Sequence, residues 1–144
     1  MPGNPVLETD VRISTDDRYG PDSKHMRIET IHGYVCFFTG DTAILLAPQI
    51  TDLEVYPDYR GMGYGEALFL MAARYLTVSP DPEARIGFKE GGLGVGLDMS
   101  GGFWEHMAQK YRGADLRDGY DGEWTFGSWG FSAEDLPLNQ TEQG

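Results

Sequence analysis

The pattern of apolar and polar residues predicts strands in the first part of the chain. Residues 6–13 alternate in part and predict a first strand at the edge of a sheet. Residues 26–38 and 42–47 are rich in strand-forming residues and flank a Thr-Gly-Asp turn at 39–41, which predicts a hairpin. Residues 50–56 predict a fourth strand, because Pro57 cannot donate to a sheet ladder and ends it.

The apolar period becomes helical after this strand. Apolar side chains recur at helical spacing over residues 63–78, and again over residues 103–111, where Gly113 ends the second predicted helix. Both segments predict helices with one buried face.

Less regular patterns fill the rest of the chain. Residues 79–82 predict a turn and residues 84–88 a short strand. The glycine-rich residues 91–96 predict either a loop near the site or a second phosphate-binding loop. Aromatic residues across 122–131 predict a last strand, and the polar residues 132–144 predict a frayed tail.

A glycine-rich turn separates the fourth strand from the first helix. It runs Arg60-Gly61-Met62-Gly63-Tyr64-Gly65 and is followed by Glu66. Three glycines at alternate positions let the backbone turn sharply and leave its N–H groups uncovered. A helix that begins there presents the positive end of its dipole, and Arg60 adds a cation, so the turn predicts a phosphate ligand. The alternative is a surface turn that only begins a buried helix.

The strand, the proline and this turn together resemble the acetyl-CoA motif of the Gcn5-related N-acetyltransferase (GNAT) superfamily. In that family an Arg or Gln, two residues and then Gly-x-Gly or Gly-x-Ala follow a strand and open a helix, as here after Leu53-Glu54-Val55-Tyr56-Pro57. The spacing differs from the dinucleotide fingerprint, and no Lys-Ser/Thr follows as in a P-loop. The resemblance implies an α/β (α+β) fold in one domain over residues 1–144, with a mixed, mostly antiparallel sheet flanked by helices.

The resemblance also implies an N-acetyltransferase, an acyltransferase that uses acetyl-CoA as its cofactor. Backbone groups of the fourth strand would hold the pantetheine arm and polarise the thioester carbonyl, and N–H groups of the glycine turn would hold the pyrophosphate. The cofactor-binding residues that it implies are Leu53, Val55, Arg60, Gly61, Met62, Gly63, Tyr64, Gly65, Glu66 and Trp104.

Acetyl transfer to an amine needs a base that takes the ammonium proton. Asp52 and Glu54 are the candidates, because alternate residues of a strand share a face and Leu53 and Val55 would face the core. The alternative is a pair of solvated strand carboxylates.

The leaving thiolate also needs a proton. Trp104 stands where the family often has a tyrosine that protonates the sulfur of CoA, and an indole N–H cannot act as that acid. Tyr111 is therefore the candidate acid, with His106 as the alternative. His25 and His32 have no ligand-like partners in the sequence, so we expect no metal site.

One departure from the family concerns the connection between the first two strands. The family places two helices there, whereas only residues 14–25 are available in this chain, so we expect these helices to be reduced or missing. The acceptor groove would then be open, which favours a lysine or N-terminus of a protein or peptide over a small amine.

Composition limits the partners. The net charge of −12 repels nucleic acid and attracts amines or basic protein surfaces, unless it only keeps the protein soluble.

The chain has no long apolar run and no signal-peptide pattern, and its one cysteine cannot form an internal disulfide, so we expect a cytoplasmic protein without a membrane span. Cys36 is expected to fill the core, with a nucleophilic role as the alternative. The aromatic residues of 122–131 predict core packing or a homodimer contact.

A rival prediction comes from a different class of protein. The tryptophan at the usual tyrosine position, the short connection and the acidic charge are also typical of a non-catalytic, GNAT-shaped interaction or inhibitor protein that binds a basic partner. Binding of acetyl-CoA separates the two predictions.

Overall fold

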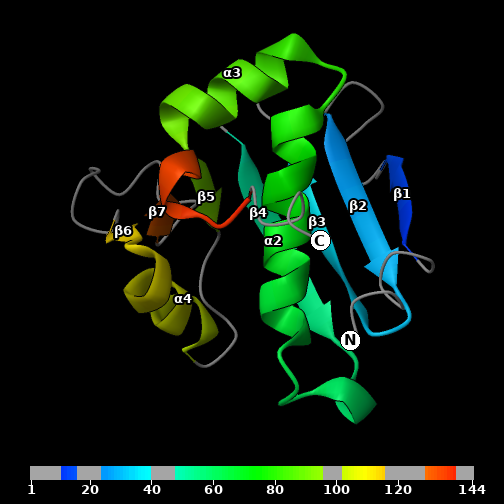
Figure 1. The fold of residues 1–144 in the computed structure, drawn as a ribbon. Coiled ribbons are helices and arrows are strands. Elements are labelled where there is room, and N and C mark those ends of the chain that lie inside the picture. Colours follow the sequence, from blue (N-terminus) through cyan, green and yellow to red (C-terminus); the bar gives the residue numbers. More distant parts are fainter. Residues whose placement is uncertain (1–10, 16–23, 40–47, 96–101, 116–128, 139–144) are drawn as a thin grey trace.

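The computed structural model describes residues 11–15, 24–39, 48–95, 102–115 and 129–138 (Figure 1). These residues form a mixed α/β fold in which a seven-stranded sheet packs against helices. The strands are β1 (Arg12–Thr15), β2 (His25–Thr30), β3 (Gly33–Phe38), β4 (Gln49–Val55), β5 (Leu93–Val95), β6 (Ala114–Asp115) and β7 (Trp129–Phe131). The α-helices are α2 (Tyr64–Val78), α3 (Pro82–Gly91) and α4 (Phe103–Tyr111), and the 3-10 helices are η2 (Pro57–Tyr59) and η3 (Ala133–Asp135).

The sheet has the order β1-β2-β3-β4-β5-β7-β6. Every pair of neighbours is antiparallel except β4 and β5, which run parallel. The prediction of a mixed, mostly antiparallel sheet with flanking helices is therefore confirmed, as are the strand expected over 50–56 and the two predicted helices. The edge strand β1 overlaps the strand expected over 6–13 only at the end of that range, and residues 6–10 lie outside the described ranges.

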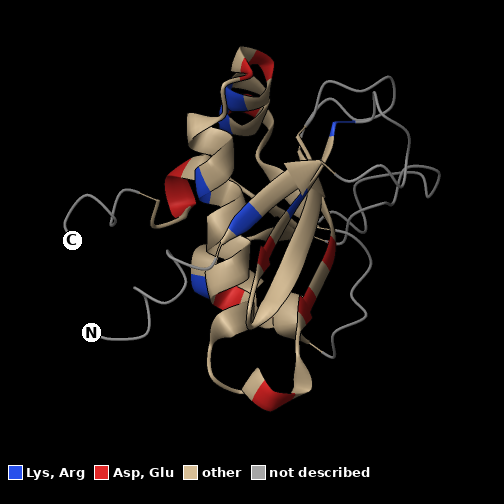
Figure 2. Cartoon of the chain, turned by 90° about the vertical axis from the view of Figure 1, so that its right-hand side faces the viewer, with Lys and Arg blue, Asp and Glu red and all other residues tan. Residues whose placement is uncertain are grey.

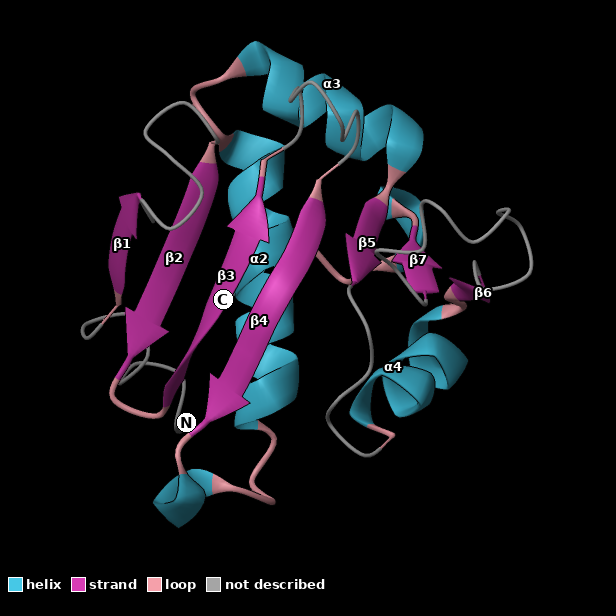
Figure 3. Ribbon diagram, turned by 180° about the vertical axis from the view of Figure 1, so that it is seen from behind, coloured by secondary structure: helices cyan, strands magenta, loops and turns pink. Residues whose placement is uncertain are grey.

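Helix α2 lies across one face of the sheet, α3 crosses one end of α2, and α4 lies next to β7 (Figures 1 and 3). The buried side chains of α2 are Leu68, Phe69, Ala72, Ala73 and Leu76. They pack against the inward side chains Ile28, Val35, Phe37 and Ile50 of the central strands. Burial of this apolar surface is the main force that holds α2 on the sheet.

The hairpin at the start of the sheet differs from the prediction. Residues 26–38 are not one strand, because the chain turns at Ile31 and His32 and pairs β2 with β3. Gly33 follows this turn at a close approach, since a Cβ there would lie 2.0 Å from the carbonyl oxygen of Glu54. Within the described residues, β3 then pairs with β4.

The predicted strand over residues 84–88 is wrong, because these residues belong to α3. The side chain of Asp81 accepts a hydrogen bond from the N–H of Glu83, and Pro82 occupies the first turn, so the segment has a capped helix start. Ala84 and Phe88, four residues apart, are buried on the same side of the helix. The expected glycine loop at 91–96 instead contains β5, and Gly92 before it has a φ of +79°.

Trp129–Phe131 form β7 and lie within the predicted last strand. The first part of the expected frayed tail is instead structured, because it contains η3 and Leu136 is only 6% exposed. Trp129 and Phe131 belong to or pack on the core, which agrees with core packing for these two aromatics.

Several predictions fall on residues outside the described ranges. They are the strand over 42–47, residues 16–23 of the first connection, residues 122–128 and residues 139–144. The reduced helices and the open acceptor groove therefore stay predictions.

Charged residues of both signs lie on the helices and strands of the described chain (Figure 2). Cys36 is fully buried, as expected for core filling. Among the described helices, none has the length and apolar character needed to cross a bilayer.

Candidate functional site

The candidate site is a cavity where β4 and β5 part. Only Gln49 and Ile50 of β4 are paired with β5, so the rest of β4, from Thr51 to Val55, has no partner strand on that side among the described residues. Figure 3 shows the two strands close together at one end and diverging toward the start of α2. Backbone groups on such an open strand edge can hydrogen-bond to a ligand.

The cavity has a volume of about 950 Å³ and runs between β4, the glycine turn, α2 and α4. Its lining contains most of the residues singled out from the sequence. They are Asp52, Leu53, Glu54, Val55, Arg60, Gly61, Gly63, Tyr64, Gly65, Glu66 and Trp104, joined by Ile50, Thr51, Tyr59, Phe103, His106 and Met107.

The glycine turn places the start of α2 at this cavity. Gly61 and Gly63 have φ values of +80° and +87°, which favour glycine, and Gly63 is the residue that precedes the helix. The N–H of Ala67 makes the first helical bond, to the carbonyl oxygen of Gly63. The preceding N–H groups, of Tyr64, Gly65 and Glu66, have no acceptor within the helix, and all three residues line the cavity.

Three aromatic rings, of His32, Tyr59 and Tyr64, pack together beside the glycine turn. The ring of His32, in the β2–β3 turn, lies parallel to the ring of Tyr64, with the two centroids 3.7 Å apart. Tyr59 packs edge-on against the same imidazole. The N–H of Tyr56 also donates to the carbonyl oxygen of His32. These contacts tie the start of α2 to the end of β4.

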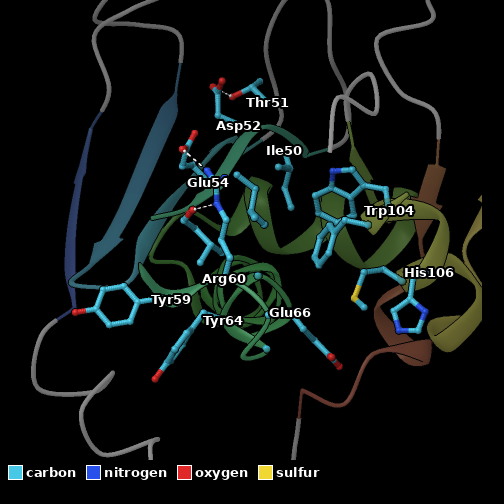
Figure 4. A pocket seen from close by; sticks show the side chains of 17 residues that line it. Ile50, Thr51, Asp52, Glu54, Tyr59, Arg60, Tyr64, Glu66, Trp104 and His106 are labelled. Carbon is cyan, nitrogen blue, oxygen red and sulfur yellow. Dashed lines mark hydrogen bonds and ion pairs between the residues drawn. The ribbon is translucent and has the colours of Figure 1, made fainter. Parts of the chain in front are cut away.

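Arg60 folds back onto β4. Its Nε donates to the carbonyl oxygen of Val55 at 2.8 Å, and its Nη2 lies 3.2 Å from Oε2 of Glu54 (Figure 4). The side chains of Arg60 and Glu54 are 60% and 44% exposed, so the ion pair faces solvent at the cavity. Glu54 is therefore neither buried nor isolated from a cation.

Leu53 and Val55 pack against the core, as predicted. Their neighbours Asp52 and Glu54 lie opposite Cys36 and Tyr34 of β3 and point to the other face of the sheet. The carboxylate of Asp52 accepts a hydrogen bond from the hydroxyl of Thr51 at 3.0 Å.

Tyr111, the expected acid, is not among the residues that line the cavity. Its hydroxyl donates to Oε2 of Glu66, which also lies 2.7 Å from Nζ of Lys110. Burial, together with the hydrogen bond to Glu66, raises the pKa of Tyr111, so its hydroxyl is a weaker acid than an ordinary phenol. The structure places the alternative, His106, on the cavity wall.

Trp104 and Met62 have opposite environments. Trp104 is 5% exposed and packs edge-on against Phe69, so it is a core residue whose edge forms part of the cavity wall. Met62 is 64% exposed and is not among the lining residues, although its glycine neighbours are.

The charge of the lining is mixed. Asp52, Glu54 and Glu66 supply carboxylates and Arg60 supplies a guanidinium. Lys110 forms an ion pair with Glu66. Burial raises the pKa of Glu66, but the hydrogen bonds from Lys110 and Tyr111 lower it more, so the pKa of Glu66 lies below its ordinary value. Within the described chain, no three His, Cys, Asp or Glu side chains gather in a way that could hold a metal ion.

The sequence did not indicate five of the lining residues, which are Ile50, Thr51, Tyr59, Phe103 and Met107. The helical spacing of Phe103 and Met107 placed them on one side of α4, but nothing local indicated that this side meets β4.

A comparison with protein-family models and with curated proteins found no match for the sequence.

Proposed function

We propose that the protein is an acetyl-CoA-dependent N-acetyltransferase of the GNAT type, which transfers an acetyl group to an amine by direct attack on the thioester. The observation that carries this proposal is the cavity along the part of β4 that is not paired with β5, which ends at the glycine turn before α2. Open backbone groups of a strand at one end and helix N–H groups at the other suit a ligand that carries both an amide-containing arm and a pyrophosphate.

The cofactor would lie along the open edge of β4. Backbone groups of Leu53, Glu54 and Val55 would bind the pantetheine arm and polarise the thioester carbonyl, because the described chain offers them no strand on that side. The pyrophosphate would bind the N–H groups from Gly61 to Glu66, where Gly61 and Gly63 have open space at the position of a Cβ.

The acceptor is an amine, and a lysine or N-terminus of a protein or peptide fits the acidic charge of the chain. The carboxylates of Asp52 and Glu54 line the cavity and attract an ammonium group. The proposal includes a cytoplasmic setting and no nucleic-acid partner.

The test is titration of the protein with acetyl-CoA in a calorimeter. We expect one site with a micromolar Kd, and we expect Arg60→Glu to weaken binding about tenfold or more, because it reverses the charge beside the pyrophosphate. Arg12→Glu, an equal charge change on the exposed strand β1, is the control and should bind as the wild type does. Absence of binding at millimolar acetyl-CoA would reject the proposal.

One observation favours the second candidate, a non-catalytic acidic module. More carboxylates than cations line the cavity, which suits a cationic segment of a partner better than an anion. If a lysine-rich peptide binds the cavity while acetyl-CoA does not, the module is the better account.

A further inference from the structure

One face of the Tyr64 ring is covered by a parallel imidazole. The ring centroids of Tyr64 and His32 lie 3.7 Å apart, and the angle between the two rings is 9°. The ring of Tyr59 stands edge-on to both, with its centroid 4.6 Å from that of His32 and 5.9 Å from that of Tyr64. Stacked and edge-on contacts of this kind have specific geometries, so they hold the Tyr64 ring flat against His32.

The sheet holds His32 in place. His32 lies in the turn between β2 and β3 and is 4% exposed. Its N–H donates to Oγ1 of Thr30 at 3.0 Å, and its carbonyl oxygen accepts a hydrogen bond from the N–H of Tyr56, just after β4. The support behind the Tyr64 ring therefore belongs to the sheet and not to the glycine turn.

The second face of the Tyr64 ring is not stacked on another ring. Within the described chain its ring contacts are with His32 and Tyr59, and Tyr64 remains partly exposed and lines the cavity. Figure 4 shows Tyr59 and Tyr64 at the end of the cavity that lies away from Thr51, with both hydroxyls directed outward. The outer end of the cavity therefore offers a flat aromatic surface whose orientation is already fixed.

This surface adjoins the proposed pyrophosphate position. Tyr64 is the first residue of α2, and its N–H is one of those without an acceptor in the helix. In CoA the pyrophosphate carries the pantetheine arm on one side and an adenosine on the other. An arm that runs into the cavity along β4 leaves the adenosine at the outer end, beside Tyr64. Met62, two positions before Tyr64 and 64% exposed, adds apolar surface near this end.

We propose that Tyr64, backed by His32, is a stacking platform for the adenine ring of CoA. The site then selects an acetyl group carried on CoA over one carried on phosphopantetheine alone. This inference rests on the proposed function. A base stacked on an aromatic side chain gains about tenfold or more in affinity, and a side chain that is fixed before binding loses little conformational entropy. His32 touches no ligand in this account and acts as a positioning residue.

The first test compares acetyl-CoA with acetyl-4′-phosphopantetheine, which lacks the adenosine, by calorimetric titration. We expect Tyr64→Leu to weaken binding of acetyl-CoA about tenfold and to change binding of acetyl-4′-phosphopantetheine less than twofold. Tyr64→Phe, which keeps the ring, should recover most of the lost affinity. Tyr34→Leu, at a tyrosine that does not line the cavity, is the control and should bind acetyl-CoA as the wild type does. Equal losses for both ligands, or no loss for acetyl-CoA, would overturn the inference.

The second test observes the adenine ring in the NMR spectrum of the ligand. A proton that lies over the face of an aromatic ring is shifted upfield, so we expect H2 and H8 of the adenine to move upfield on binding to the wild type. The shift should be lost in Tyr64→Leu, and its persistence there would contradict stacking on Tyr64.

The support from His32 is tested separately. His32→Phe, which keeps a flat ring behind Tyr64, should retain most of the acetyl-CoA affinity that His32→Ala loses, with binding of acetyl-4′-phosphopantetheine little changed in either. Thermal unfolding confirms that each variant folds. Equal affinities of the two variants for acetyl-CoA would reject the positioning role of His32.

Failure of the platform and failure of the proposed function give different results. A wild type that binds acetyl-CoA and acetyl-4′-phosphopantetheine equally well rejects the platform and keeps the proposed function. A preference for acetyl-CoA that persists in Tyr64→Leu also rejects the platform, because the additional phosphates then carry the preference. A wild type that binds neither ligand rejects the proposed function together with the platform.

Discussion

Nζ of Lys110 in α4 lies 2.7 Å from Oε2 of Glu66 in the first turn of α2. The ion pair joins the two helices on either side of the cavity, and the hydroxyl of Tyr111 donates to the same carboxylate oxygen. Glu66 is therefore both a lining residue and the anchor that holds α4 against α2. The contact makes the stability of this corner depend on pH.

The first prediction concerns that dependence. Burial raises the pKa of Glu66, but the hydrogen bonds from Lys110 and Tyr111 outweigh burial and leave the pKa below its ordinary value. A lowered pKa in the folded state stabilises the fold fully above the ordinary carboxyl pKa of about 4.3, and this stabilisation is lost as the pH falls through the lowered pKa.

Lys110→Met should therefore make the free energy of unfolding fall less steeply than in the wild type as the pH drops from about 5 to 3. Urea unfolding at a series of pH values measures this slope. Lys89→Met, which removes a lysine from the last turn of α3, is the control and should keep the wild-type slope. Parallel curves for Lys110→Met and the wild type would contradict the prediction.

The second prediction compares two glycines in the same conformation. Gly63 and Gly102 precede α2 and α4 with φ values of +87° and +100°, and a Cβ would meet nothing within 4 Å at either. Ala at either position should cost about 1 kcal/mol of stability through backbone strain. Only Gly63→Ala should also weaken acetyl-CoA binding, about tenfold, because only Gly63 lines the cavity. Equal affinities for acetyl-CoA in the two variants would contradict the claim that the glycine turn binds the cofactor.

The third prediction compares two glycines of the sheet. A Cβ on Gly33 would collide with the backbone of Glu54, whereas a Cβ on Gly94 would lie 3.9 Å from its nearest neighbours. We expect Gly33→Ala to destabilise the protein by about 3 kcal/mol, since β3 must move away from β4. Gly94→Ala should change the free energy of unfolding by less than about 1 kcal/mol. Chemical denaturation decides, and similar losses in both variants would be inconsistent with the register of β3 and β4.

The fourth prediction follows from the place of Tyr111. Because its hydroxyl bonds to Glu66 and does not line the cavity, Tyr111→Phe should leave kcat for acetyl transfer within about twofold of the wild type. It should lower stability by about 1 kcal/mol through the lost hydrogen bond. A fall in kcat of a hundredfold would return Tyr111 to the acid role that the sequence suggested.

The sequence predicted the elements whose signals are local. Arg60 to Gly65 carry the turn in their own residue types, and the apolar spacing after them is long enough to identify α2. The residues before Pro57 predict a strand equally clearly. These three features place the glycine turn at the end of a strand, as the structure has it.

The features that were missed depend on contacts between distant segments. Thr51 is an extra residue that forms a β-bulge in β4, which follows from the register of β3 with β4, and its contact with His25 joins residues 26 positions apart. Helix α3 was mistaken for a strand because Ala84 to Phe88 is short, although Asp81 and Pro82 before it are a helix start. The bond from Tyr111 to Glu66 spans 45 positions, and no spacing rule predicts it.

The most direct test of the account is an NMR titration of the ¹⁵N-labelled protein with acetyl-CoA. We predict that the largest amide shift changes fall on Leu53, Glu54 and Val55 at the open edge of β4 and on the residues from Gly61 to Glu66, with Ile13 and Ser14 on β1 unchanged. Shift changes confined to other surfaces, or no change at millimolar acetyl-CoA, would contradict the claim that this cavity binds the cofactor.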